Sequence, residues 1–197
     1  MKVLLLFLFL LIKLNFAFSQ KEIAIDAFDI SILSSYNVIL SSSTDKLINF
    51  LGKPNNFSLN RIARCVEDGI RNNEKDFKYD AIFYTDLRLA YIIQNDNVSL
   101  WSIYFDEKHR LSIEHPLITF DKDLHIENFI KVFQINEDRV ALINGGLVPF
   151  EASYKDKYYC ITFVCVGTCD ELLSFYFNKN GYLRAIYFPL QIGNVSK

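Results

Sequence analysis

Apolar and polar residues alternate along much of the chain after residue 80, with the two-residue period of strands that bury one face. The longest such stretch, 81–94, predicts a single strand with Asp86 and Arg88 as an exposed pair on its polar face. The segments after it predict an antiparallel meander, with a turn at 95–97, a strand at 98–105, a turn at 106–109 and a short strand at 110–113.

Two other regions alternate in the same way. Between Phe28 and Leu40, two short stretches predict a strand or a hairpin-like pair of strands. Near the C-terminus, strands are predicted at 140–143, 158–166, 172–177 and 182–188. The last two are joined by Asn178-Lys179-Asn180-Gly181, and Asn-Gly at such a junction strongly favours a hairpin.

The first amphipathic helix is predicted at 45–51, where apolar residues recur at helical spacing. The hydroxyl cluster 41–44 before it is suited to capping the free amides of a helix N-terminus. Gly52 ends this helix, and Pro54 prevents it from resuming. Its predicted inward-facing residues are Leu47, Ile48, Phe50 and Leu51.

Two more helices are predicted on the same grounds. One covers 59–70 with Ser58 as its N-cap, because apolar residues recur there at three- and four-residue steps. The other covers 123–134, where Asp121 or Asp123 would sit near the positive end of the helix dipole.

This order of elements predicts an α+β fold, with antiparallel β-meanders and about three helices packed on the sheet. Residues 20–197 are enough for one well-buried domain. Helical segments precede a meander twice, which suggests the hypothesis of two similar halves, 20–117 and 118–197.

The first nineteen residues have the layout of a cleaved secretory signal peptide. Lys2 is followed by an apolar run that Lys13 interrupts, and small residues precede a cleavage site between Ser19 and Gln20. A retained membrane anchor is the alternative, but a span needs about 20 apolar residues. We therefore expect a secreted or periplasmic protein with no transmembrane span after leader removal.

Charge and aromatic content narrow the class of partner. The formal net charge is −2, and losing Lys2 and Lys13 with the leader makes it more negative. Nucleic-acid binding is not expected, because it requires a positive field.

Aromatic residues make up 15% of the chain, which is consistent with a β-rich core. An aromatic ligand-binding surface is the alternative.

Cys65, Cys160, Cys165 and Cys169 are the four cysteines, and export would permit disulfides among them. Cys160 and Cys165 should point to opposite faces of one strand and cannot bond each other. Cys165 and Cys169 could pair across a three-residue hairpin loop, which would leave Cys65 with Cys160. A zinc site and free buried thiols remain alternatives.

The segment 42–54, with a short helix followed by Leu51-Gly52-Lys53-Pro54, resembles a motif of small exported bacterial α/β modules. That group includes the small lipoprotein of outer-membrane assembly and the tandem-repeat β-lactamase inhibitory protein. The resemblance implies a fold in which helices lead into an antiparallel sheet, and a non-enzymatic envelope or binding role. None of the binding residues of that group has a match here.

A search of the sequence for catalytic and metal-binding motifs assigns no functional site. The chain lacks Gly-x-Ser-x-Gly, His-Glu-x-x-His and phosphate-binding glycine loops. His125-Ile126-Glu127 matches part of a deaminase zinc motif without its cysteines, so His125 is expected to be polar surface. His109 and His115 could bind a metal with Glu114, but solvent exposure is the more common fate of such residues. We predict no catalytic, cofactor or metal residues.

The leading hypothesis is an exported non-enzymatic binding or structural module of the bacterial envelope, with a protein or envelope partner of unknown identity. One alternative is a small secreted hydrolase whose carboxylates and histidines assemble only in the fold. It requires a deep pocket holding at least two of Asp86, Asp106, His109 and His115. The other alternative is a secreted inhibitor, which requires Trp101, Tyr104 or Tyr176 to be exposed on one face.

Overall fold

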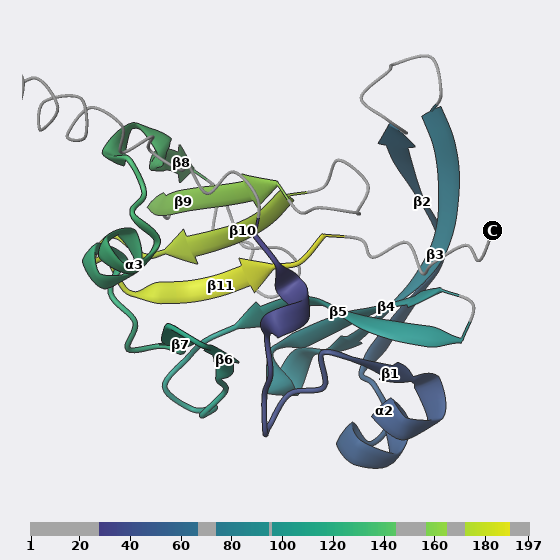
Figure 1. Ribbon diagram of the computed structural model, residues 1–197. Helices are drawn as coiled ribbons and strands as arrows, with labels where there is room; N and C mark the ends of the chain where they lie inside the picture. The colour runs from purple at the N-terminus through teal and green to yellow at the C-terminus, as the bar shows by residue number, and fades with distance from the viewer. Residues whose placement is uncertain (1–27, 67–73, 95, 145–156, 165–171, 190–197) are drawn as a thin grey trace, which may run out of the picture.

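A nine-stranded antiparallel sheet forms the body of the protein (Figure 1). The computed structural model describes residues 28–66, 74–94, 96–144, 157–164 and 172–189, without the side chains of 60–66, 74–78, 144, 164 and 172. The strands of the sheet are β1 (Ser41–Ser43), β2 (Asn56–Val66), β3 (Glu74–Tyr84), β4 (Leu89–Gln94), β5 (Asn97–Tyr104), β8 (Ala141–Asn144), β9 (Lys157–Val164), β10 (Leu172–Phe177) and β11 (Leu183–Tyr187).

Two meanders make up this sheet, in the strand order β2-β3-β4-β5-β11-β10-β9-β8. Each meander ends at the centre, where β5 and β11 pair antiparallel with Ile103 opposite Ile186. The short β1 pairs with the first residues of β5, Ser41 opposite Ser99. A separate two-stranded sheet consists of β6 (Ile113–His115) and β7 (Ile118–Phe120).

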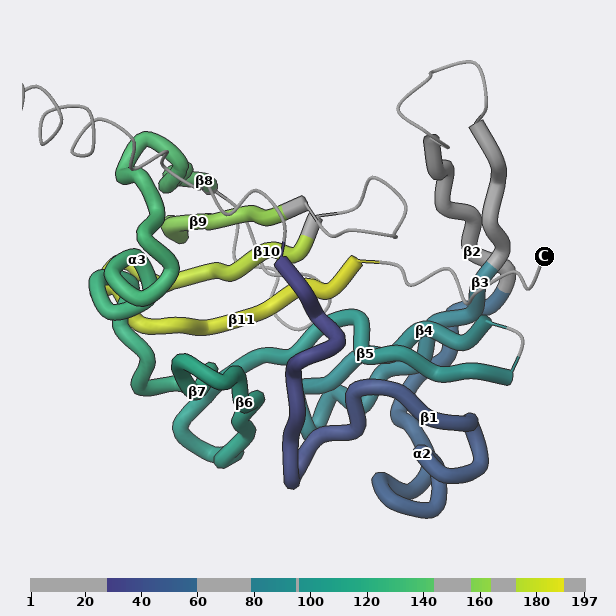
Figure 2. The backbone as a smooth tube through the Cα atoms, in the orientation of Figure 1, coloured from purple at the N-terminus to yellow at the C-terminus, as the bar shows by residue number. Residues whose placement is uncertain are grey.

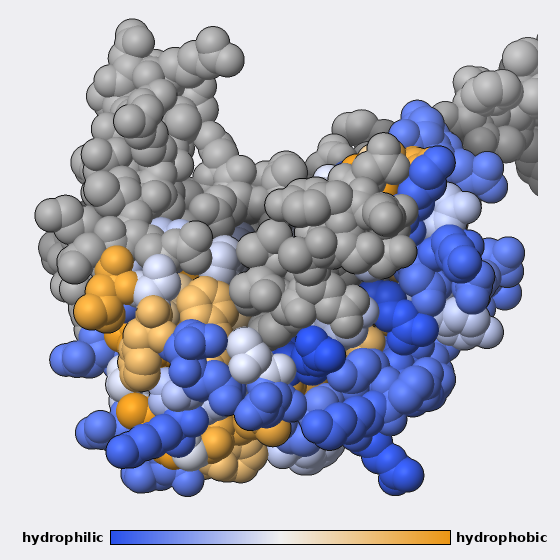
Figure 3. Space-filling model, turned by 180° about the vertical axis from the view of Figure 1, so that it is seen from behind, coloured by the Kyte–Doolittle hydropathy of each residue, from blue (hydrophilic) through white to orange (hydrophobic). Residues whose placement is uncertain are grey.

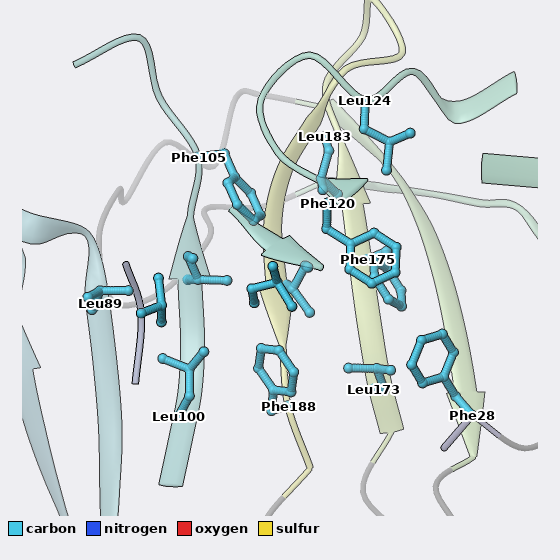
Figure 4. Packing of buried hydrophobic residues seen from close by; sticks show 14 of the residues in the cluster. Phe28, Leu89, Leu100, Phe105, Phe120, Leu124, Leu173, Phe175, Leu183 and Phe188 are labelled. Carbon is cyan, nitrogen blue, oxygen red and sulfur yellow. The ribbon is translucent and has the colours of Figure 1, made fainter. Parts of the chain in front are cut away.

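The helices and the β6–β7 hairpin lie over one face of the sheet, together with the chain from Phe28 to Leu40 (Figures 1 and 2). The α-helices are α2 (Thr44–Leu51) before the first meander and α3 (Ile126–Phe133) before the second. We call this side the helix-covered face. Buried side chains from all these elements form one hydrophobic cluster with the sheet (Figure 4).

Phenylalanine rings fill the part of this cluster beneath α3. The Phe129 ring lies 4.6 Å from that of Phe175 and 5.4 Å from that of Phe177, between centroids. Phe28 adds contacts with Phe163 and Phe175 at 5.4 and 5.9 Å. Such tilted aromatic pairs add to the free energy gained by removing apolar area from water.

The prediction of a helix at 45–51 is confirmed by α2. Gly52 ends it with φ +82°, and its amide donates to the carbonyl oxygen of Ile48 at 2.8 Å. The predicted inward face is only partly correct: Leu47 is buried, whereas Phe50 is 57% exposed. With 3.6 residues per turn, these four side chains spread over about 160° of the helix circumference, and Phe50 lies at one edge of that arc.

The predicted helix at 123–134 corresponds to α3, with Phe129 and Phe133 buried as expected. Its N-cap is His125, whereas the sequence favoured Asp121 or Asp123 near this end. The helix begins later because Asp121 instead accepts a hydrogen bond from the Asp123 amide at 2.9 Å within the preceding turn.

The predicted helix at 59–70 is wrong for residues 59–66, while 67–70 lie outside the described residues. The described residues therefore contain two α-helices and not three. Residues 56–66 form β2, which pairs with β3 from Asn56 opposite Phe83 to Val66 opposite Glu74. Short apolar segments do not discriminate well between helix and strand. Here pairing with β3 determines the outcome, since β3 pairs with β2 on both sides of a register shift between Ser58 and Arg61.

The predicted single strand at 81–94 is also wrong, because a turn divides it into β3 and β4. A 3-10 turn at Thr85–Leu87 is followed by Arg88 in the left-handed conformation, with φ +62°. Asp86 accepts a hydrogen bond from the Asn55 side-chain amide at 2.9 Å. Asp86 and Arg88 therefore belong to the turn and do not lie on a strand face.

Two further strand predictions need correction. Residues 110–113 were expected to extend the meander, but only Ile113 joins a strand, and β6 pairs with β7 outside the main sheet. Residues 28–40 form no hairpin: the 3-10 turn η1 (Ile30–Ile32) is followed by a single bridge from Ser34 to Glu114. The remaining predicted strands correspond to β5, β8, β9, β10 and β11 within a few residues at each end.

Within the described part of the chain, no helix has both the length and the hydrophobicity needed to span a bilayer.

Candidate ligand-binding site

The N-terminus of α3 is held against the turn between β10 and β11. The amide of Ile126 donates to the carbonyl oxygen of Gly181 at 2.8 Å. His125 and Tyr182 form an isolated β-bridge, and their rings meet edge to face with centroids 5.2 Å apart. We call these contacts the α3–turn clasp. It joins two segments about 55 residues apart in sequence.

Both ring nitrogens of His125 take part in the clasp. Nδ1 accepts from the Glu127 amide at 3.4 Å, which caps the helix, and Nε2 lies 3.2 Å from the carbonyl oxygen of Asn180. A carbonyl can only accept and a backbone amide can only donate, so these two contacts match a ring with its proton on Nε2. With both nitrogens engaged, His125 serves a structural role at this site.

Gly181 allows the close approach of the turn to this imidazole. Its φ is +83°, and an added Cβ would collide with the His125 ring. Asn178 fixes the rest of the turn, because its Oδ1 accepts from the amides of Asn180 and Tyr182, each at 3.0 Å. Asn-Gly therefore acts here as predicted, and it also makes room for the helix cap.

A cavity of about 490 Å³ opens beside the clasp, and we call it the α3–β9 cavity. Its apolar lining comes from Ile126, Ile130, Val140, Leu142 and Tyr159. Glu137 and Lys179 add one charge of each sign. Small-molecule sites are typically apolar clefts of about 300–1,000 Å³ with a few polar groups, which describes this cavity.

Asp106 and His109 are the only pair among the hydrolase candidates that the described structure brings into hydrogen-bond reach. The Asp106 carboxylate lies 2.9 Å from His109 Nδ1, accepts from the His109 amide at 2.8 Å and contacts Arg88 Nε at 3.3 Å. Partial burial raises the pKa of Asp106, but the hydrogen bonds from His109 and Arg88 outweigh it and hold that pKa below its usual value.

This Asp106 network lies in a surface turn and lines neither the α3–β9 cavity nor the smaller one described below. Asp86 bonds to Asn55, and His115 packs among Phe28, Phe120 and Phe133 with centroids 5.1–5.9 Å away. Burial lowers the pKa of His115. Neither the α3–β9 cavity nor the smaller one is lined by any of the four hydrolase candidates, so these two cavities give that hypothesis no support.

The sheet face opposite the helices carries a second cluster, which we call the tyrosine cluster: Tyr104, Tyr158, Tyr176 and Tyr187, with Ala185 and Ile143. The Tyr176 and Tyr187 rings are 5.3 Å apart. Burial raises the pKa of Tyr176 to about 12 and that of Tyr187 as well. These phenols are neutral at physiological pH and provide no general base.

Cys160 is buried beside Tyr176 and carries a free thiol in the structure. Burial raises its pKa, which the hydrogen bond with Tyr176 opposes, so it is a structural thiol and not an activated nucleophile. The Cys65 side chain, Cys165 and Cys169 lie outside the described residues, as do Ser19 and Gln20. Cys160, the expected partner of Cys65, forms no disulfide in the structure, while a Cys165–Cys169 disulfide and cleavage of the leader stay predictions.

The inhibitor hypothesis required one of three aromatic residues to be exposed. Tyr104 is buried, while Trp101 and Tyr176 are half-buried. Trp101 packs against Phe83 with ring centroids 6.2 Å apart. Seen from behind, the described surface is largely hydrophilic, with apolar residues gathered mainly on one side (Figure 3). Because only Tyr104 of the three is buried, the inhibitor hypothesis stays a prediction.

No group of three or more His, Cys, Asp or Glu side chains that could hold a metal occurs within the described residues. Glu114, the expected partner of His109 and His115, instead accepts a hydrogen bond from Thr119 at 2.6 Å. Comparisons with protein-family models, curated proteins and solved structures found no match.

Sequence reasoning missed the residues that line the α3–β9 cavity. Glu137, Tyr159 and Lys179 come from three separate elements and belong to no motif. The only local signal was Asn180-Gly181, which indicated a tight turn but not that α3 would dock on it.

Proposed function

We propose that the protein is an exported, non-enzymatic binding module that takes a small, largely apolar ligand in the α3–β9 cavity. The observation that carries this proposal is the cavity itself: an apolar lining with two charged side chains beside the α3–turn clasp. His125, the residue there best suited to proton transfer, has both ring nitrogens engaged in hydrogen bonds.

The position of the cavity supports binding. Its walls come from α3, β8, β9 and the β10–β11 turn, and the clasp fixes α3 relative to that turn. A site held by packed elements loses little conformational entropy when a ligand enters. Leu142, 58% exposed at the cavity, would lose its contact with water on ligand binding.

The experiment uses the neutral fluorescent probe N-phenyl-1-naphthylamine and the purified mature chain. We expect saturable binding that is at least tenfold weaker in Leu142→Glu, because the substitution places a charge against an apolar ligand. Leu117→Glu is the matched control, since Leu117 is 65% exposed in the β6–β7 turn and lines neither cavity. Equal binding by both variants, or no saturable binding, would refute the proposal.

Export is tested separately, because it depends on the predicted signal peptide. The proposal requires the cellular protein to be found outside the cytoplasm, with Gln20 as its first residue. Intact-mass analysis with and without reductant measures both leader removal and disulfides. Recovery from the cytoplasm with Met1 retained would contradict export and leave the binding proposal standing.

We also propose that the chain is built from two similar halves, 20–117 and 118–197. Support comes from topology: a helix precedes a four-stranded antiparallel meander in each half, and the final strands meet at the centre. This arrangement is consistent with the resemblance to tandem-repeat exported modules.

A further inference from the structure

A second, smaller cavity of about 210 Å³ lies on the other side of the β10–β11 turn, next to the tyrosine cluster. Three cations line it, Lys157, Lys179 and Arg184, and the buried rings of Tyr104 and Tyr158 are among its walls. We call it the cationic pocket. No carboxylate lines it among the described residues.

The fold determines why these three cations meet. Phe177 pairs with Tyr159, so the turn that carries Lys179 lies beside the start of β9, where Lys157 is found. The β10–β11 register shifts between Tyr176 and Phe177, which leaves Arg184 as an extra residue in β11. A bulge of this kind redirects a side chain relative to regular alternation.

Among the described residues, no side chain neutralises the charge of the pocket. Within the described residues, Lys157, Lys179 and Arg184 form no ion pair, whereas nearby Arg88 contacts Asp106 at 3.3 Å. Three like charges around one small cavity repel each other, and this occurs in a chain of net charge −2. An anion in the pocket would relieve that repulsion.

We propose that the cationic pocket binds a tetrahedral oxyanion, a phosphate or the phosphate of a monoester. The guanidinium of Arg184 can present two parallel N–H donors to such a group, and the two lysines act as mobile point charges. The volume is below the usual range for a whole drug-sized ligand, so it suits a head group. This site is separate in chemistry from the apolar α3–β9 cavity.

The test titrates the mature full chain with inorganic phosphate and with glycerol phosphate by calorimetry at low salt. We expect saturable binding that is at least tenfold weaker in Lys157→Gln/Arg184→Gln. The matched control is Lys46→Gln/Lys108→Gln, which removes the same charge from exposed positions outside the pocket. Its affinity should stay within about twofold of the parent.

A vesicle arm identifies the source of the oxyanion. Binding to phosphatidic acid vesicles but not to the soluble phosphates would assign a lipid head group, and the reverse would assign a soluble ligand. Equal weakening in the two double variants, or no saturable binding in any arm, would overturn the proposal. Lys157→Gln should bind N-phenyl-1-naphthylamine as the parent does, because Lys157 does not line the α3–β9 cavity. The phosphate result and the apolar-ligand result can therefore be judged independently.

Discussion

The two faces of the sheet come from the same strands but differ in chemistry. On the helix-covered face, β9, β10 and β11 present Phe163, Phe175, Phe177, Leu183 and Ile186. On the opposite face the same strands present Tyr158, Cys160, Ser174, Tyr176 and Tyr187. Alternation thus produced two partly or fully buried faces, and the helix-covered one is mainly apolar, with Tyr159 packed against it.

This difference separates a face held together by aromatic and aliphatic packing from a face that also contains hydrogen-bonding groups. Phenyl rings on the helix-covered face can only pack, and many lie within 6 Å of each other. The opposite face keeps hydroxyl, thiol and cationic groups, so it depends on hydrogen bonds, and it borders the cationic pocket. We therefore expect substitutions to affect the two faces unequally.

Truncating Phe175 should have the largest effect. Phe175 is fully buried against Phe28, Phe129 and Phe163. Phe175→Ala should lower the free energy of unfolding by about 3–5 kcal/mol, because it leaves a cavity. Urea unfolding measures this loss. Tyr187→Phe on the opposite face is the control and should change the free energy of unfolding by less than about 1 kcal/mol. Similar losses in the two variants would contradict the difference between the two faces.

Gly181→Ala should have the next largest effect, about 1–3 kcal/mol, because the residue has a positive φ and its new Cβ would meet the His125 ring. Urea unfolding of Gly181→Ala, His125→Ala and the double variant separates these contributions. The clasp predicts a smaller loss for Gly181→Ala in the His125→Ala background. An unchanged loss would show that backbone strain alone is responsible.

Asp106→Asn should cost about 1 kcal/mol at pH 7, since the carboxylate accepts hydrogen bonds from His109 and Arg88 beside Tyr104. The folded-state pKa of Asp106 is lowered from 3.8, so this stabilisation is present above pH 3.8 and is lost as the pH falls through the folded pKa. Unfolding at a series of pH values should show the gap to the parent closing below pH 3.8. A pH-independent gap would contradict this account.

Ser102→Ala should have the smallest effect. The Ser102 hydroxyl is buried on the opposite face, and its oxygen has no hydrogen-bond partner in the described structure. Removing it should leave stability unchanged or raise it by up to about 1 kcal/mol. Ser174→Ala is the control, because the Ser174 side chain is hydrogen-bonded to Tyr176 and its loss should destabilise. Thermal unfolding compares the two.

Local signals explain the predictions that the structure confirmed. Gly52 ended α2, the helical spacing of Phe129 and Phe133 marked α3, and Asn180-Gly181 marked the β10–β11 turn. Each depends on backbone or side-chain preferences within a few residues. Such preferences can be recognised without knowing what the segment packs against.

The secondary-structure predictions were wrong where the conformation of a segment depends on contacts with residues distant in sequence. Residues 56–66 pair with β3 and became a strand, although apolar residues recur there at helical spacing. The turn at 85–88 is supported by Asn55, some thirty residues earlier. Neither the α3–β9 cavity nor the cationic pocket was visible in the sequence, because their lining residues are contributed by separate elements.

By itself, the amino-acid sequence determined that this is an α+β protein rich in antiparallel strands, because alternation, helical spacing and turn residues act over short distances. Only the tertiary structure decided which strands lie side by side, that β5 and β11 join the two meanders, and that Lys157, Lys179 and Arg184 surround one pocket. Those outcomes depend on strand register and on one bulge, which arise from pairing between segments and not from any segment alone.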